Sequence, residues 1–528
     1  MRNMPLNSQD EYFLDSDTPT APTHVGGLEI FHLPRGAKED FMQRLFQSMR
    51  ATPVHAEPFN YRLAMVPEPK RPSRLGALAW LAPTPRNKGK PKGKLVRRWE
   101  VLDEVHVGEH LYLHALPRPG GQRELGELVS RLHVNRLDRS RPLWEMHLIE
   151  GLEGGRYAIY TKLHHSQFDG QRGMALSRHL RSPDPATRGL PPVWGVQLPA
   201  EPAGTAKGTK AAPAPGLVDA LGAWGKALST MADARDHTGR EGVVAPYTAP
   251  ACILNGPLTA RRRLGTQSLS IPRMKALGAA VEGGATVNEI LLAVCAGALR
   301  RYLLDEKALP DAPLIVACPV AQTRQDGAAS GNAVGQILVS LCTHIADPKK
   351  RLLAVVASSK ANKGLMKDLD ASSYRNYTHL SMIPQILAAK TGFGHKVLLA
   401  NTIISNVPGP RETQYVNGAR LEAMYSTSML LAGQALNITA SNFGDSLDLG
   451  ILACPDLCPS PQNIAVHVGE ELAILERAMG LGAHRVATKK ATRTKTPAPT
   501  KRKAPARKAP TRPTRPTTRG LSAAKRMK

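Results

Sequence analysis

Two neighbouring segments in the first half of the chain have the apolar and polar spacing of β-strands. The segments LWEMHLIEGL and RYAIYTKLHH predict two strands, and the Gly-rich EGLEGG between them predicts a hairpin. Alternation along the second strand puts on one face Tyr157, Ile159, Thr161, Leu163 and His165, and on the other Ala158, Tyr160, Lys162 and His164. Two adjacent histidines cannot both reach one site from a regular strand. One is therefore expected to do chemistry while its neighbour makes structural hydrogen bonds.

Helical spacing and continuous apolar runs predict further elements. One early helix is predicted from the apolar positions Phe41, Met42, Leu45, Phe46 and Met49. Thr286 and Glu289 form the T-x-x-E pattern of a capping box, which predicts a helix that continues through Leu304. Strands buried on both faces are predicted for LIVACPV, GQILVSLCTHI and LDLGILACP. The chain is therefore expected to have a mixed α/β fold.

A predicted amphipathic helix follows an Ala-, Gly-, Pro- and Lys-rich stretch over residues 199–215, which has linker composition. Its apolar stripe consists of Leu217, Leu221, Trp224, Leu228 and Met231. We expect this stripe to pack on the body of the protein. A membrane-surface or lipid-access helix is the alternative, which the small number of positive charges on the polar face weakens.

These patterns divide the 528 residues into four segments. Residues 1–195 and 256–484 are expected to fold as two domains, because one hydrophobic core rarely organises so long a chain. Residues 196–255 form a linker with the amphipathic helix, and residues 485–528 form a tail rich in Lys, Arg, Ala, Pro and Thr. The tail has too little apolar surface to offset the entropy of ordering, so we expect disorder there.

Positive charge is concentrated in the tail, which has sixteen Lys and Arg residues and no acidic residue. Removing them from the formal net charge of +27 leaves +11 for residues 1–484. Such a tail can bind polyanions through salt-sensitive contacts, or it can serve only as a solvated appendage. Because no aromatic residue lies among its charges, it lacks the stacking groups of a dedicated single-strand binder.

The cysteines and the N-terminus indicate a reducing compartment. Six cysteines in a chain of this length do not suggest a disulfide framework, and Cys454 and Cys458 have no second pair with which to bind zinc. The opening MRNMPLNSQDEYFLDSD is acidic where a signal peptide needs an apolar stretch. No apolar run approaches the roughly twenty residues needed to cross a bilayer. A cytoplasmic protein is therefore expected.

The candidate chemistry lies in the segment HHSQFDG, residues 164–170. Neutral imidazole, with a reference pKa of about 6.5, suits the removal of a hydroxyl proton during acyl transfer. A thioester is already activated, so the enzyme needs no covalent nucleophile, and no G-x-S-x-G elbow is evident. Asp169 is expected to pair with an arginine and anchor the loop, and Gly170 to allow tight backbone geometry. A hydrogen-bonded turn or part of a metal site is the alternative for this motif.

The motif resembles H-H-x-x-x-D-G of the coenzyme A-dependent acyltransferase superfamily, and its context is similar to bacterial wax ester synthase/acyl-CoA:diacylglycerol acyltransferases. Five blocks carry the resemblance: LNSQDEYFLDSDTPTAPTHVGGLEIF, LDRSRPLWEMHLIEGLEGGRYAIYTKLHH, ATVNEILLAVCAGALRRYL, NTIISNVPGP and ALNITASNFGDSLDLGILACPD. Glu289 departs from the usual aspartate of the third block, and PVAQTR departs from the usual PVS-x-R. The tail lies outside the resemblance.

The resemblance implies two chloramphenicol-acetyltransferase-like domains with a tunnel between them and His165 at its middle. It makes His165 the general base, with His164 supporting and with Asp169 and Gly170 structural. The implied substrate-binding residues are Asn288, Ser405, Asn406, Pro408 and Gly409. For Asn288 a cap or turn is the alternative, and for Asn406 a turn before Pro-Gly-Pro. We expect Trp144 to pack in the core.

The resemblance also implies a reaction: transfer of a long fatty acyl group from acyl-CoA to diacylglycerol or a fatty alcohol, which gives triacylglycerol or wax ester. Acyl-CoA is then a substrate, and no cofactor or metal is expected. The protein would associate peripherally with the inner membrane or with lipid inclusions. An acyltransferase for a polyketide or peptidyl-amine acceptor is one alternative. A non-catalytic lipid-binding or granule-associated protein with a polyanion-binding tail is the other.

Overall fold

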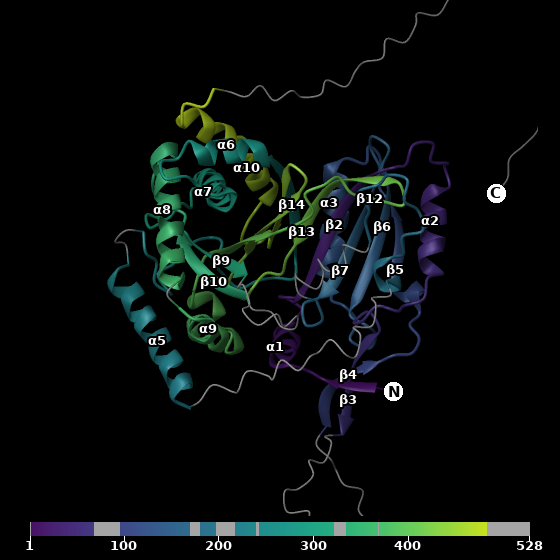
Figure 1. The fold of residues 1–528 in the computed structure, drawn as a ribbon, viewed down its shortest axis with the longest axis horizontal. Coiled ribbons are helices and arrows are strands. Elements are labelled where there is room, and N and C mark those ends of the chain that lie inside the picture. Colours follow the sequence, from purple (N-terminus) through teal and green to yellow (C-terminus); the bar gives the residue numbers. More distant parts are fainter. Residues whose placement is uncertain are drawn as a thin grey trace, which may run out of the picture. The chain divides into compact units, whose positions relative to one another are not determined.

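Figure 1 shows a computed structural model of the protein, which describes residues 2–67, 95–168, 180–196, 217–238, 242–321, 334–367 and 369–482. Met1–Ala483 form one unit, whereas His484–Lys528 form a second unit outside the described residues. The disorder predicted for residues 485–528 therefore stays a prediction, as does the division of the chain into four segments.

The first six-stranded sheet contains the predicted hairpin. Its strands, in order across the sheet, are β12 (Tyr415–Val416), β13 (Ala419–Thr427), β2 (His24–His32), β7 (Arg156–His164), β6 (Trp144–Leu152) and β5 (Leu111–Ala115). All neighbours are antiparallel except β5 and β6. The alternation along β7 is confirmed, because Tyr157 and Ile159 enter one buried cluster while Ala158 and Tyr160 enter another. We call this sheet, with the helices α2 (Phe41–Arg50) and α3 (Gln122–Val134), the first lobe.

The second six-stranded sheet contains all three strands predicted from continuous apolar runs. Its strands, in order, are β10 (Val334–Ser340), β9 (Ile315–Ala321), β11 (Thr402–Val407), β14 (Leu436–Phe443), β15 (Ser446–Ala453) and β8 (Arg263–Ser270). β11 is parallel to both of its neighbours, and the other pairs are antiparallel. Its helices are α6 (Ile271–Ala279), α7 (Val287–Asp305), α8 (Pro348–Lys367), α9 (Ala371–Lys390) and α10 (Pro461–Ala478). We call this assembly the second lobe.

Smaller elements complete the described residues. A three-stranded sheet consists of β1 (Arg2–Pro5), β4 (Leu95–Val101) and β3 (Tyr61–Pro67). The remaining helices are α1 (Ser8–Ser16), α5 (Leu217–Asp236) and the single-turn η2 (Val107–Glu109), η3 (Val193–Gly195) and η4 (Gly394–Lys396). Within this part of the chain, no helix is long and apolar enough to span a membrane.

The helix α7 is buried on nearly every side, as its apolar run predicts. The capping box is confirmed, because the Thr286 hydroxyl accepts the Glu289 N–H while the Glu289 carboxylate accepts the Thr286 N–H at 2.8 Å. Gly297 lets α10 approach closely, since a Cβ there would collide with the carboxylate of Glu471. The main core of the second lobe forms around this helix.

Strand β13 joins the two lobes, although it belongs to the second half of the sequence. It pairs with β2 in the first sheet, where Tyr425 lies opposite Leu28 and Thr427 opposite Gly26. It also contacts β14 and β15 of the second sheet. The helix α3 packs against β8, so that one buried cluster draws on β2, α3, β8 and β13. The two lobes therefore share a strand and a core.

The helix α5 leaves part of its predicted apolar stripe exposed, and the side chains of Leu217 and Leu221 lie outside the described residues. Trp224 and Leu228 are exposed, whereas small residues of the neighbouring positions, Ala227 and Ala234, are buried. The expectation that the stripe packs on the body was therefore wrong for Trp224 and Leu228. The helix α5 packs against α9 (Figure 1), and its Ala234 joins a small buried cluster with Val243 and Ala245 beside α8, so Trp224 and Leu228 are not on the covered side.

Candidate active site

The end of β7 separates the two histidines of the motif. His164 is the last residue of the strand and lies opposite His24 of β2. His165 begins the following turn, and its N–H donates to the carbonyl of Thr23 at 3.0 Å. The side chain of His164 is buried, whereas that of His165 is partly exposed. The two histidines therefore have different surroundings, because the strand ends between them.

Both ring nitrogens of His164 are engaged, and the partners assign its tautomer. The hydroxyl of Thr23 donates to the carbonyl of Phe13 at 2.9 Å, so the Thr23 oxygen accepts from Nε2 of His164 at 3.2 Å. On the other side, the N–H of Ser166 donates to Nδ1 at 3.2 Å, and the Ser166 hydroxyl lies 2.7 Å from the same nitrogen. These partners place a proton on Nε2 and make Nδ1 the acceptor, which is the pattern of a structural histidine.

Asp17 anchors this arrangement from the N-terminal segment. Its Oδ2 lies 3.9 Å from Nε2 of His164 and accepts from Arg136 at 2.6 Å and from Arg139 at 3.0 Å. Its Oδ1 accepts the N–H of Thr23 at 3.2 Å. Burial alone would raise the pKa of Asp17, but His164 and Arg136 outweigh burial and hold the pKa well below its usual range. The carboxylate is therefore ionised and bridges the segment before β2 to the loop after α3.

The ring of His165 stacks on Phe13 of α1. The two ring centroids are 4.2 Å apart and the planes differ by 21°. Phe13 is buried, and its carbonyl is the acceptor for the Thr23 hydroxyl. The same segment is also tied to the second half of the chain, because Arg262 donates to the carbonyl of Thr20 at 2.6 Å. One wall of the candidate site is thus built from the segment before β2.

A buried polar network supports the far side of β7. The ammonium of Lys162 donates to Glu145 at 2.7 Å and to two backbone carbonyls at the end of α3. Glu145 has its pKa lowered to about 2, because its partners His147 and Lys162 outweigh the effect of burial. Burial and the charge of Lys162 lower the pKa of His24 to about 3, so His24 is neutral. This network fixes the position of the strand that delivers the histidines.

In the second lobe, the residues around Asn288 have defined structural roles. The N-cap of α7 is Thr286, so capping does not require Asn288, whose side chain is partly buried. The carboxylate of Glu289 is occupied by the Thr286 N–H and by Lys363, both at 2.8 Å. Glu289 therefore secures the start of the helix, and a pocket role for Asn288 stays a prediction.

The loop after β11 makes a close backbone contact. Ser405 and Asn406 lie in β11 beside β14, and Pro408 and Gly409 follow the strand. A Cβ at Gly409 would collide with the carbonyl of Asn442, so this approach requires glycine. The buried Oδ1 of Asn406 has no hydrogen-bond partner among the described residues. A buried polar atom without a partner is unusual in a native protein, which is consistent with a bound polar group beside Asn406.

Some predicted features fall elsewhere or outside the described residues. Asp169 and Gly170 lie outside them, so their roles stay predictions, as does the convergence of the second-lobe residues on His165. Trp144 is confirmed as core: it is buried, and its indole N–H donates to the carbonyl of Phe59 at 2.8 Å. The sequence interpretation did not find Asp17 or Phe13. The acidic opening segment was visible, but its partner arginines lie more than a hundred residues away.

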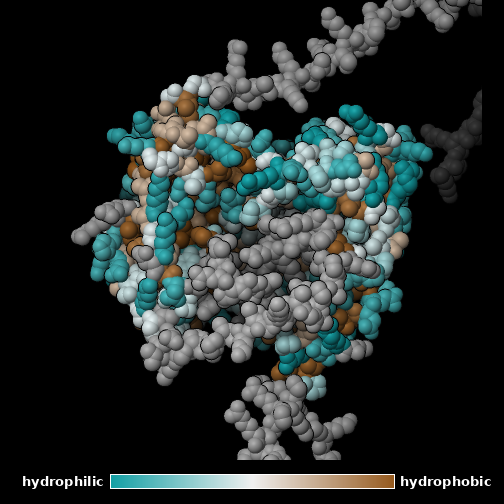
Figure 2. All heavy atoms as spheres, in the orientation of Figure 1, coloured by the Kyte–Doolittle hydropathy of each residue, from teal (hydrophilic) through white to brown (hydrophobic). Residues whose placement is uncertain are grey.

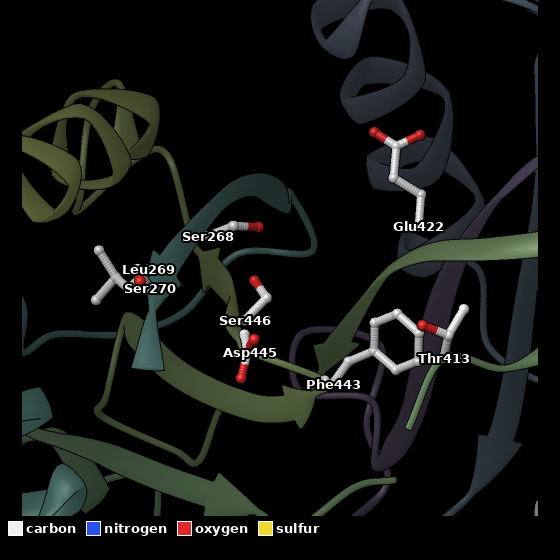
Figure 3. A pocket seen from close by; sticks show the side chains of 9 residues that line it. Ser268, Leu269, Ser270, Thr413, Glu422, Phe443, Asp445 and Ser446 are labelled. Atoms are coloured by element: carbon white, nitrogen blue, oxygen red, sulfur yellow. The ribbon is translucent and has the colours of Figure 1, made fainter. Parts of the chain in front are cut away.

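A hollow of about 420 Å³ lies at the edge of the second sheet, next to the loop that follows β11 (Figure 3). It is lined by Ser268, Leu269, Ser270, Thr413, Glu422, Phe443, Gly444, Asp445 and Ser446. Figure 3 shows the Phe443 ring beside Thr413, with Asp445 and Ser446 next to each other. None of these residues belongs to the histidine motif. The hollow therefore does not include the histidine motif, and the predicted tunnel stays a prediction.

Comparison with known proteins identifies the fold and then the family. The solved structure of a wax ester synthase/diacylglycerol acyltransferase from Marinobacter aquaeolei VT8 superposes with a TM-score of 0.69 at 33% identity, over 90% of this chain and 100% of that one. A condensation domain of the calcium-dependent antibiotic synthetase shares only the fold, with a TM-score of 0.50 at 16% identity over 91% and 97% of the chains. The protein therefore has the two-lobed, chloramphenicol-acetyltransferase-like α/β fold.

The sequence matches the wax ester synthase/diacylglycerol acyltransferase catalytic domain over residues 6–80 and 80–291, and the WS/DGAT C-terminal domain over residues 330–476. A Mycobacterium tuberculosis protein provisionally named as a diacylglycerol O-acyltransferase is 38% identical over 479 residues, which is 89% of this chain and 99% of that protein. The O-acyltransferase WSD of Acinetobacter baylyi is 33% identical over 479 residues, covering 89% and 97%. This chain belongs to the wax ester synthase/diacylglycerol acyltransferase family of acyltransferases.

Proposed function

We propose that this protein transfers a long-chain acyl group from acyl-CoA to the hydroxyl of diacylglycerol or of a fatty alcohol, with His165 as the general base. Family membership supports the reaction class. The observation that supports the choice of base is the hydrogen bonding of His164, whose two ring nitrogens both have protein partners. The neighbouring ring of His165 is partly exposed, as a group that meets substrate must be.

The proposed step balances without a cofactor. The acceptor hydroxyl attacks the thioester carbonyl while the imidazole of His165 takes its proton. The tetrahedral intermediate then collapses, the C–S bond breaks, and the imidazolium returns the proton to the leaving thiolate of coenzyme A. Phe13 keeps the ring in place by stacking, and Thr23 fixes the backbone through its carbonyl. The products are an ester and free coenzyme A.

The second lobe would supply the groups that stabilise the oxyanion and hold the chains. Asn288 lies in the first turn of α7, where side-chain and backbone donors can face a developing negative charge. The side chain of Asn406 offers an Oδ1 that has no hydrogen-bond partner in the part of the chain that the structure describes. Ser405, Pro408 and Gly409 would line the same pocket. Asp169 and Gly170 are proposed to hold the turn after the histidines.

A thiol-release assay tests the proposed reaction. Purified protein is incubated with palmitoyl-CoA in detergent, with dioleoylglycerol, with hexadecanol or without acceptor, and free thiol and lipid product are both measured. We expect thiol release that depends on acceptor, with triacylglycerol or wax ester formed in equal amount. Absence of alcohol-dependent release across the acceptor panel would contradict the proposal and favour a lipid-binding protein. An amine acceptor is included as well. If thiol is released only with the amine, the protein acylates amines and not alcohols.

A further inference from the structure

Phe13 is buried without being part of a hydrophobic cluster. On the visible face of the protein, hydrophobic residues are interspersed with hydrophilic ones (Figure 2), whereas Phe13 is only 7% exposed. The other buried phenylalanines all belong to one apolar cluster: Phe31, Phe59, Phe168 and Phe443. No cluster of buried apolar side chains that the described residues form includes Phe13. The reason for its burial therefore lies in its ring contacts and not in a share of the core.

Two aromatic contacts and one threonine hold the Phe13 ring on the imidazole of His165. The Phe13 and His165 rings are stacked, with centroids 4.2 Å apart and planes that differ by 21°. The ring of Tyr12 meets Phe13 edge-on, with centroids 5.3 Å apart. Thr23 joins the two backbones, because its hydroxyl donates to the Phe13 carbonyl at 2.9 Å and its carbonyl accepts the His165 N–H at 3.0 Å. The face of the benzene ring is thus fixed on the imidazole.

Other stacked imidazoles in the protein have a different environment. His110 stacks on Trp144 with ring centroids 4.3 Å apart, and His147 stacks on Tyr160 with centroids 5.8 Å apart. Burial lowers the pKa of both histidines, so these two rings stay neutral near pH 7. His165 is partly exposed. Among these three stacked imidazoles, it is therefore the one whose protonation burial opposes least.

We propose that the face of the Phe13 ring stabilises the imidazolium that His165 becomes when it takes the proton of the acceptor hydroxyl. The face of a benzene ring carries negative charge and attracts a cation within about 6 Å of its centroid. The imidazole is neutral before the transfer and gains positive charge in the transition state, so the attraction lowers the barrier. Phe13 is a positioning residue, because it acts through His165. This inference rests on the proposed function.

Fluorinated phenylalanines in place of Phe13 test this electrostatic role, because fluorine withdraws charge from the ring face and barely changes the shape of the ring. Mono-, di- and trifluorophenylalanine are introduced into the full chain. The single-turnover rate of acyl transfer from palmitoyl-CoA to hexadecanol and the steady-state KM for palmitoyl-CoA are measured. We expect the rate to fall with each added fluorine, by about 2- to 30-fold over the series. The KM is expected to stay within about twofold of wild type. A rate that does not depend on fluorination would overturn the proposal.

Phe13→Leu and Phe31→Leu form a matched pair. Phe31 is also buried, and its ring stacks on Tyr157 with centroids 5.2 Å apart and planes that differ by 16°. Both substitutions remove a stacked ring, but only Phe13→Leu removes it from an imidazole. We expect a loss of about 2- to 30-fold in the single-turnover rate of Phe13→Leu and of less than about twofold in Phe31→Leu. Equal losses would assign the effect to packing and would also overturn the proposal.

Two further comparisons make the outcome unambiguous. Fluorination keeps the volume of the ring, so the series tests the proposal even if Phe13→Leu fails to fold. Full activity of His165→Ala would contradict the proposed function itself. A flat fluorine series in an enzyme that His165→Ala inactivates would overturn only the role of Phe13.

Discussion

Thr23 contacts both histidines of the motif through different atoms. Its carbonyl accepts the backbone N–H of His165, and its hydroxyl oxygen accepts from the ring of His164. A residue 142 positions before His165 therefore sets the geometry of the pair. The sequence singled out the histidines through their motif and its resemblance to the family, and their catalytic role stays a prediction. It could not identify Thr23 or Asp17, because their role depends on contacts between segments far apart in the chain.

Asp17 makes a testable contribution to stability. Because its pKa is lower in the folded protein than in the unfolded chain, this group stabilises the fold above about pH 4, and the effect is lost as the pH falls toward the folded pKa. Asp17→Asn is expected to lower the free energy of unfolding by about 1.5–3 kcal/mol at pH 7. The difference from wild type should shrink below about pH 3 in denaturant titrations.

The control for this prediction is Asp15→Asn. Asp15 also pairs with an arginine, Arg97, but its side chain is 51% exposed. It should therefore change stability by less than about 1 kcal/mol at either pH. An equal loss in the two variants, or a difference between Asp17→Asn and wild type that does not depend on pH, would contradict the assigned role of Asp17.

At the scale of elements, sequence patterns predicted correctly the helices and strands that interactions between nearby residues determine. The hairpin of β6 and β7, the capping box of α7 and the three apolar strands are confirmed, because alternation, capping and burial on both faces leave a signature in consecutive residues. The orientation of α5 was predicted wrongly for Trp224 and Leu228, which are exposed. Periodicity marks an apolar stripe, but it does not say which side of the helix its neighbours cover.

The packing of α8 on α10 depends on a buried ion pair. Arg351 donates to Glu471 at 2.7 Å, and both side chains are almost fully buried. Burial raises the pKa of Glu471 although Arg351 opposes the effect, so the carboxylate needs this partner. Arg351→Met is expected to cost about 3–5 kcal/mol of unfolding free energy, measured by chemical denaturation.

Two further variants test the cause of that loss. Arg351→Met/Glu471→Leu should recover much of the stability, because it removes the unpaired buried charge. Arg123→Met, in the exposed pair of Arg123 with Glu127, should change stability by less than about 1 kcal/mol. Equal losses of unfolding free energy in Arg351→Met and Arg123→Met would show that the buried pair contributes no more to stability than the exposed one.

At the scale of the whole molecule, the sequence did not predict how the two lobes are joined. Strand β13 pairs with β2, which lies about 400 residues earlier, and no local pattern encodes such a pairing. Gly26 shows how tight this contact is, since a Cβ there would collide with the Thr427 side chain. The resemblance to the family predicted two lobes correctly, whereas the shared strand became visible only in the structure.

The basic tail makes a separate prediction at this scale. Deleting residues 485–528 removes sixteen positive charges that lie outside the family match. We expect thiol release to stay within about twofold of wild type, while salt-sensitive binding to anionic surfaces falls. The measurement is binding to anionic vesicles or polyphosphate over a salt series. Loss of turnover on deletion would contradict the separation of the tail from catalysis.

The most direct test of His165 as the general base is the rate of thiol release by His165→Ala, compared with His164→Ala and wild type. With palmitoyl-CoA and hexadecanol at saturation, His165→Ala is expected to lower the rate by at least about 10²-fold with an unchanged circular dichroism spectrum. His164→Ala should lose less, because that ring positions the turn and does not take the proton. Full activity of His165→Ala, or a greater loss in His164→Ala, would contradict His165 as the base.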